Sequence, residues 1–201
     1  RISLLITAIG ISFLLENLAQ LIIGAGAKPI PPLFSGAPLA LGSIKISFTA
    51  IVTIIVSLIA MALLTFLVQK TKMGKAMRAV SEDMGAAQLM GISVNKTISF
   101  TFAIGSALAG IGSVLYVSAY PQANPTMGAM LGLKAFVAAV LGGIGSIPGA
   151  MIGGFAIGLA EALVSAAGLS VWKDGVVFAI LIIVLLVKPT GIMGRTMQEK
   201  V

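Results

Sequence analysis

Three long apolar runs constrain this chain more than any other feature of its sequence. They cover residues 2–23, 48–68 and 98–120, and the first run contains the polar residues Glu16 and Asn17. The hydrocarbon core of a bilayer is about 30 Å thick and a helix rises about 1.5 Å per residue, so about 20 apolar residues span it. Each run therefore predicts a membrane-spanning helix.

Three shorter apolar stretches, near 130–141, 150–166 and 175–187, predict further helices. Of the 201 residues, 58% are hydrophobic and 9% are charged, and the mean hydropathy is +1.12. A soluble domain has about half apolar and about a quarter charged residues. The sequence thus predicts an all-α polytopic bundle of about five or six membrane helices, forming a single transmembrane domain over residues 1–201.

The composition excludes several classes of function. The chain has no histidine and no cysteine, so thiol nucleophiles, imidazole bases and the usual transition-metal ligands are absent, and we expect no metal and no cofactor. The net charge is +7, but the basic residues lie at the ends of apolar runs and are not interleaved with aromatic residues, so nucleic-acid binding is not expected.

The positions of the basic residues predict the orientation in the membrane. Residues 69–97 form a polar loop with five of them, and the C-terminal tail has three more, whereas the loop between the first two runs has two. The polar loop contains Lys70, Lys72, Lys75, Arg78 and Lys96. The tail contains Lys188, Arg195 and Lys200, and the loop between the first two runs contains Lys28 and Lys45. Lysine and arginine favour the cytoplasmic side, so the 69–97 loop and the tail are predicted to be cytoplasmic. The first loop, rich in proline, is predicted to be external and to contain a short extended or hairpin structure.

The same topology makes residues 130–166 a helical hairpin whose bend is the segment LGGIGSIPGAMIGG. This segment lacks the lysine and hydroxyl of a phosphate-binding P-loop and the spacing of a dinucleotide motif. Small residues instead recur every four positions, first from Gly145 to Gly153 and then from Gly154 to Ala166, which favours close helix packing. The predicted bend residues are Gly142, Gly143, Gly145, Pro148 and Gly149. Two interpretations of the bend are consistent with this pattern: a fixed packing corner, or a hinge that moves as the pathway opens.

The cytoplasmic loop is predicted to form one helix from Lys75 to Met90 that ends at Gly91. Its apolar side chains would lie on one face, and Arg78 and Glu82 are spaced to meet on its surface. From these patterns alone, the helix could equally be a solvated connector between two spans. The predicted apolar face consists of Met77, Val80, Met84, Ala87 and Met90.

Within this loop, the arrangement A-A-x-x-x-G at Ala86, Ala87 and Gly91 resembles the cytoplasmic loop by which ABC-transporter permeases dock onto their ATPase subunits. Gly85 stands where that loop has a glutamate, and Glu82 and Asp83, one turn earlier, are the candidate substitutes. The segments GKAMRAVSEDMGAAQLMGI, KAFVAAVLGGIGSIPGAMIGGFAIGLAEAL and WKDGVVFAILIIVLLVKPTGIMGR look like the permease family for branched-chain amino acids. This resemblance implies a role in ATPase coupling for Arg78, Glu82, Asp83, Ala86, Ala87 and Gly91.

The resemblance also implies the setting. It would make the chain a non-enzymatic subunit in the bacterial inner membrane, beside a second permease subunit, two cytoplasmic ATPase subunits and a periplasmic amino-acid-binding protein. It covers the chain from ITAIGISFLLEN onward, and family members begin with further membrane helices, so we expect the first helices to be missing here. Two alternatives stay open: a permease for urea or an amide, and an ion-coupled secondary transporter. The absence of an inverted internal repeat argues against the second.

Polar residues inside the predicted spans are the remaining candidates, as intramembrane groups or as part of a pathway: Glu16, Asn17, Lys134 and Glu161. An ionisable group in a membrane needs a partner or water. Measured from the bend, Lys134 and Glu161 lie on opposite arms of the hairpin at heights that differ by about one helical turn. We therefore expect them to form an ion pair that ties the arms together. The alternative is that one of them contacts the charged groups of a substrate.

Overall fold

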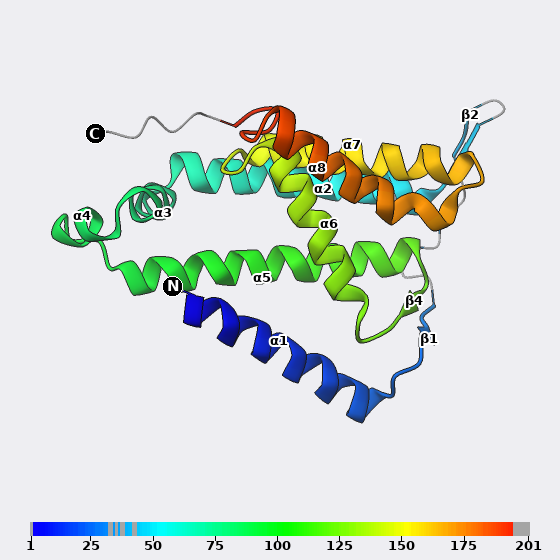
Figure 1. Cartoon of the computed structure of the whole chain (residues 1–201), viewed down its shortest axis with the longest axis horizontal. Helices are drawn as coiled ribbons and strands as arrows, with labels where there is room; N and C mark the ends of the chain where they lie inside the picture. Colours follow the sequence, from blue (N-terminus) through cyan, green and yellow to red (C-terminus); the bar gives the residue numbers. More distant parts are fainter. Residues whose placement is uncertain (1, 32–33, 35, 37–38, 42–43, 195–201) are drawn as a thin grey trace. The chain divides into compact units, whose positions relative to one another are not determined.

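Helices make up most of the chain in the computed structural model, which describes residues 2–31, 34, 36, 39–41 and 44–194 (Figure 1). Arg1, Arg195 and Lys200 lie outside these described residues. The helices are α1 (Ile2–Ile23), α2 (Phe48–Lys70), α3 (Lys72–Glu82), α4 (Met84–Leu89), α5 (Val94–Ala119), α6 (Met127–Gly142), α7 (Ile147–Ala166) and α8 (Lys173–Val187), with one 3-10 turn, η1 (Ser170–Trp172).

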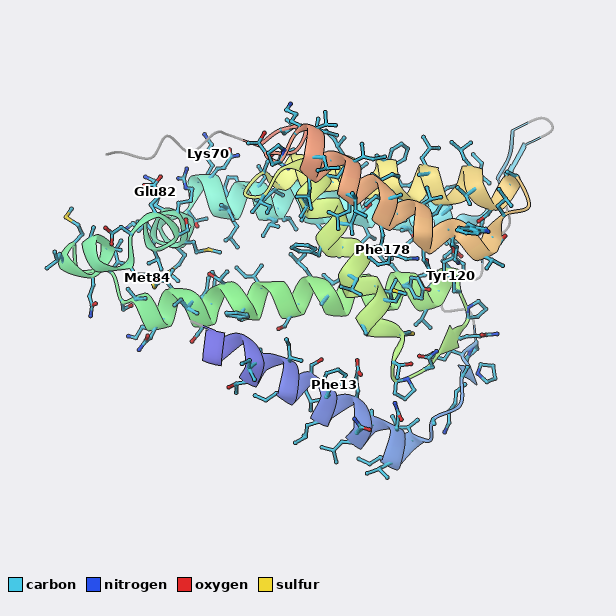
Figure 2. The ribbon with its side chains drawn as sticks, viewed as in Figure 1. Phe13, Lys70, Glu82, Met84, Tyr120 and Phe178 are labelled. Atoms are coloured by element: carbon cyan, nitrogen blue, oxygen red, sulfur yellow. The ribbon has the colours of Figure 1, made fainter. Side chains whose placement is uncertain are left out.

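Five of these segments are long and apolar enough to cross a membrane: α1, α2, α5, α7, and α8 together with η1. Helix α6 is apolar but shorter. The predicted all-α polytopic bundle is therefore confirmed, with one somewhat shorter apolar helix in addition to five segments of spanning length among the described residues. Most side chains of the spans are exposed; Phe13 of α1, labelled in Figure 2, is 60% exposed.

Two compact units make up the chain: Arg1–Thr53 with Gly110–Gly132, and Ile54–Ala109 with Leu133–Val201. The first unit contains α1 and two small antiparallel sheets. Strand β1 (Lys28–Pro29) pairs with β4 (Gln122–Ala123), and β2 (Leu39–Leu41) pairs with β3 (Ile44–Ile46). The β2–β3 pair confirms the short hairpin predicted in the first loop. The β1–β4 pair joins that loop to the segment after α5, which the local sequence pattern did not reveal.

The second unit contains the core that positions the hairpin. Its buried apolar cluster consists of Val137 and Leu141 of α6, Ile157 of α7 and Val177 of α8. Val137 and Val177 have almost no exposed surface. The three helices α6, α7 and α8 therefore pack around one shared apolar layer, which fixes the two ends of the hairpin relative to one another.

Candidate functional site

The glycine-rich segment forms the predicted bend. Helix α6 ends at Gly142 and α7 begins at Ile147. Between them, Gly143 has a φ of 104°, in the left-handed region that favours glycine. Ser146 caps α7, since its hydroxyl accepts a hydrogen bond from the Gly149 amide at 3.2 Å, and Pro148 lies in the first turn of the helix, where it needs no amide hydrogen.

Close backbone packing at the bend explains part of the glycine pattern. A Cβ atom on Gly142 would overlap the backbone of Gly149, and one on Gly153 would overlap the carbonyl of Ala138. Gly158, by contrast, has open space where its Cβ would be. Gly149 and Gly153 of the first predicted series therefore pack closely within the hairpin, whereas Gly158 of the second series does not.

The segment after α8 folds back onto the bend and closes it. The amide of Ile192 donates to the carbonyl of Leu141, and that of Met193 to the carbonyl of Gly142, both at 2.9 Å. Gly143 fits directly against the backbone of Gly194, with no room for a Cβ atom. The bend and the chain after α8 thus lie on the same side, as the predicted topology requires, and these contacts favour a fixed packing corner over a hinge.

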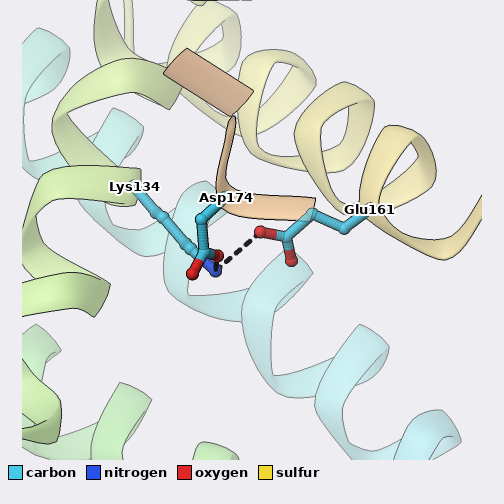
Figure 3. A network of polar contacts seen from close by, with 3 residues as sticks. All are labelled: Lys134, Glu161 and Asp174. Carbon is cyan, nitrogen blue, oxygen red and sulfur yellow. Dashed lines mark ion pairs between the residues drawn. The ribbon is translucent and has the colours of Figure 1, made fainter. Parts of the chain in front are cut away.

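At the other end of the three-helix core, Lys134 of α6 lies between two carboxylates (Figure 3). Its Nζ is 2.7 Å from Glu161 Oε1 on α7 and 2.6 Å from Asp174 Oδ1 on α8. The expected ion pair between the two arms of the hairpin is confirmed. Asp174 is a third member that the sequence did not reveal, because the predicted helix began at residue 175, whereas α8 begins at Lys173 and includes Asp174.

The positions of these three residues follow from the helical repeat. Lys134 lies three residues before the core residue Val137, and Asp174 lies three residues before Val177. Glu161 lies four residues after Ile157, the core residue of α7. Because residues three or four apart share one face of a helix, all three side chains point into the junction that the core defines. The spacing of three residues between Asp174 and Val177 places both on one face of a helix, and this spacing could have identified Asp174 as the third member of the cluster.

The other intramembrane candidates stand apart from this cluster. Glu16 is half-buried on α1, and no ion pair involves it within the described part of the chain. Asn17 is exposed, and its side-chain amide donates to the Phe13 carbonyl of the preceding turn at 2.7 Å. The structure thus brings Lys134 and Glu161 together but gives Asn17 only a local backbone contact.

The 69–97 loop contains two helices where the sequence predicted one. Asp83 has extended backbone angles (φ −150°, ψ 112°), so the predicted helix over Lys75–Met90 is wrong at this residue. Its carboxylate accepts hydrogen bonds from the amides of Gly85 and Ala86 at 2.8 and 3.0 Å and thereby caps α4. An aspartate competes with the helix by bonding nearby amides in this way, which explains the break.

The break also changes what the candidate coupling residues do. Arg78 and Glu82, which were expected to meet, form no ion pair among the described residues; Arg78 Nη2 instead donates to the carbonyl of Gln69 at 3.4 Å. Asp83 is occupied as a helix cap, while Glu82 lies exposed in the last turn of α3 (Figure 2). The single apolar face expected along the loop is therefore divided between two helices.

Helix α4 exposes apolar side chains at its far end. Ala87 is its buried anchor at 4% exposure, whereas Leu89 and Met90 are 90% and 83% exposed. The helix stops as predicted, because Gly91 has a φ of 80° and ends the helical turn. A shallow groove of about 540 Å³ runs between α4 and the start of α5. Two large apolar side chains are thus exposed together at the end of a capped helix that lies between two spans.

The fold and these features define a multi-pass helical membrane protein with a structured polar loop between two of its spans. Residues 1–185 match the model of the family described as branched-chain amino acid transport system / permease component. The chain belongs to this family of transport permease subunits.

Three relatives illustrate the match. The chain is 48% identical to the high-affinity branched-chain amino acid transport system permease protein LivH of Salmonella typhimurium and to LivH of Escherichia coli K12, and 43% identical to BraD of Pseudomonas aeruginosa. Each alignment covers 100% of this chain and 67% of the relative. The relatives are thus longer than this chain, as the resemblance led us to expect. No solved structure matches the chain at a significant level.

Proposed function

We propose that this chain is a permease subunit of an ATP-driven ABC importer in the bacterial inner membrane, and that the imported substrates are leucine, isoleucine and valine. Its membrane helices form part of the translocation pathway. The proposed partners are a second permease subunit, two cytoplasmic ATPase subunits that bind and hydrolyse ATP, and a periplasmic amino-acid-binding protein. Family membership supports the substrate class, and the exposed end of α4 supports the connection to an ATPase.

In this proposal α4 transmits the state of the ATPase to the spans α2 and α5. Leu89 and Met90 insert into a cleft of the ATPase, and the caps at Asp83 and Gly91 keep the short helix rigid enough to transmit force. The permease alternates between an inward-open and an outward-open arrangement of its helices. Closure of the ATPase dimer shifts this equilibrium, because the nucleotide-bound dimer binds one of the two arrangements more tightly than the other. The exposure of Leu89 and Met90 is the observation that carries this step.

Replacing the exposed apolar end with charge tests this coupling. We expect the double variant L89D/M90D, in the assembled transporter in proteoliposomes, to lose amino-acid uptake and stimulation of ATP hydrolysis by the binding protein roughly tenfold or more, since buried apolar anchors dominate interfaces. Both quantities are measured on the same preparation, together with the amount of ATPase subunit that copurifies.

The matched control is L89M/M90L, which keeps the apolar surface and should retain coupling. Both residues are exposed, so neither variant removes a core contact of this chain. Normal uptake by L89D/M90D would contradict the docking role of α4.

A further inference from the structure

Helix α3 carries a basic face that the proposed coupling through Leu89 and Met90 of α4 does not use. Lys72, Lys75 and Arg78 recur at every third residue, so they lie along one side of the helix. All three are exposed, as is Lys70 in the last turn of α2. Among the described residues, none of these four forms an ion pair with a carboxylate.

The opposite side of α3 is apolar and protected. Met73, Met77 and Val80 recur three or four residues apart and are half-buried. The basic side chains are therefore the free surface of the helix, and Glu82 is the one acidic residue within the bounds of α3. This leaves an excess of positive charge on an exposed face.

The place of α3 in the chain brings this face to the surface of the membrane. Helix α2 has 23 residues, about 35 Å at about 1.5 Å per residue, slightly more than the hydrocarbon thickness, so Lys70 at its end lies at headgroup depth. Thr71 caps α3 directly afterwards, and Gly74 is in backbone contact with Leu67 and Val68. In Figure 1, α3 is seen nearly end-on where α2 runs across the view, so the chain turns sharply here.

We propose that Lys70, Lys72, Lys75 and Arg78 form a binding site for the phosphates of anionic phospholipids such as phosphatidylglycerol. Arg78 Nη2 donates to the carbonyl of Gln69 at 3.4 Å, which holds its guanidinium against the last turn of α2, at the depth of the headgroups. A basic cluster immediately after a membrane span attracts anionic lipids, at about 1 kcal/mol per Lys or Arg. The site would fix α3, and with it the base of the coupling loop, against the membrane.

The test measures lipid binding directly. The purified transporter is titrated with phosphatidylglycerol or phosphatidylcholine in detergent, and bound lipids are counted by native mass spectrometry. We expect K72Q/K75Q to weaken phosphatidylglycerol binding roughly tenfold or more, with phosphatidylcholine binding unchanged. K72R/K75R should retain binding. The matched control K28Q/K96Q removes two exposed charges elsewhere and should bind phosphatidylglycerol like the parent.

Three results would overturn the proposal. Unchanged phosphatidylglycerol binding by K72Q/K75Q would exclude the site, and an equal loss in K28Q/K96Q would show a general charge effect. Unchanged lipid binding with a loss of copurifying ATPase would assign the basic face to an acidic surface of the ATPase. Because the lipid count requires no transport, its outcome is independent of the substrate and coupling proposals.

Discussion

Replacement of Lys134 by methionine is expected to destabilise the protein more than any other single charge removal. Without the Lys134 ammonium group, the carboxylates of Glu161 and Asp174 are left facing each other in a low-dielectric site. Removing one partner of a buried ion pair lowers the free energy of unfolding by about 3–5 kcal/mol. Because the side chains of Lys134 and Glu161 are 19% and 25% exposed, water reduces this penalty, and we expect a loss of about 2–3 kcal/mol here. Thermal unfolding of the purified membrane protein measures the loss.

Two controls separate the ion cluster from a general charge effect. K173M removes the neighbouring lysine, which forms no ion pair within the described residues, and should unfold like the parent. The triple variant K134M/E161Q/D174N removes all three charges and should recover at least half of the lost stability. Zero coupling in a K134M and E161Q double-mutant cycle would contradict the structural role. A stable triple variant that no longer transports would instead assign the cluster to the substrate.

The second large effect is expected at the glycine corner. In G143A, the new Cβ would overlap the backbone of Gly194, and the φ of 104° would be strained for alanine. We expect a loss of stability on the order of 3 kcal/mol, because the strain and the overlap add and neither can relax without undocking the segment after α8. The same thermal unfolding assay reports it.

Two other glycines supply graded controls. Gly145 has a φ of 93° but open space around it, so G145A should cost only the backbone strain, about 1 kcal/mol. Gly158 is helical and unobstructed, so G158A should be neutral or slightly stabilising. If G143A were as stable as G158A, the corner would not be closely packed, and a hinge would become the better interpretation.

The membrane helices could be predicted because their signal is local and strong. The predicted run at 2–23 coincides with α1, and the second begins at Phe48 as α2 does. Composition over about 20 residues decides such a helix, since the bilayer leaves few alternatives. The Lys134–Glu161 pair could also be predicted, because a hairpin with a known bend sets the heights of both residues.

What could not be predicted depends on competition between local interactions or on contacts between distant segments. Asp83 breaks the helix predicted over Lys75–Met90 because its carboxylate caps α4, whereas intrinsic helix propensity alone favoured continuation. Asp174 joins Lys134 only once α8 packs on α6 and α7. The docking of Ile192 on Leu141 joins segments about fifty residues apart, and no local sequence pattern reports such contacts.

Uptake into proteoliposomes tests the central proposal most directly. The chain is reconstituted with the proposed permease, ATPase and binding-protein partners, and labelled leucine is supplied outside with ATP inside. We predict uptake that requires ATP and the binding protein and that excess isoleucine or valine suppresses. Uptake driven by a proton or sodium gradient without ATP, or competition by urea or amides but not by isoleucine and valine, would contradict the assignment.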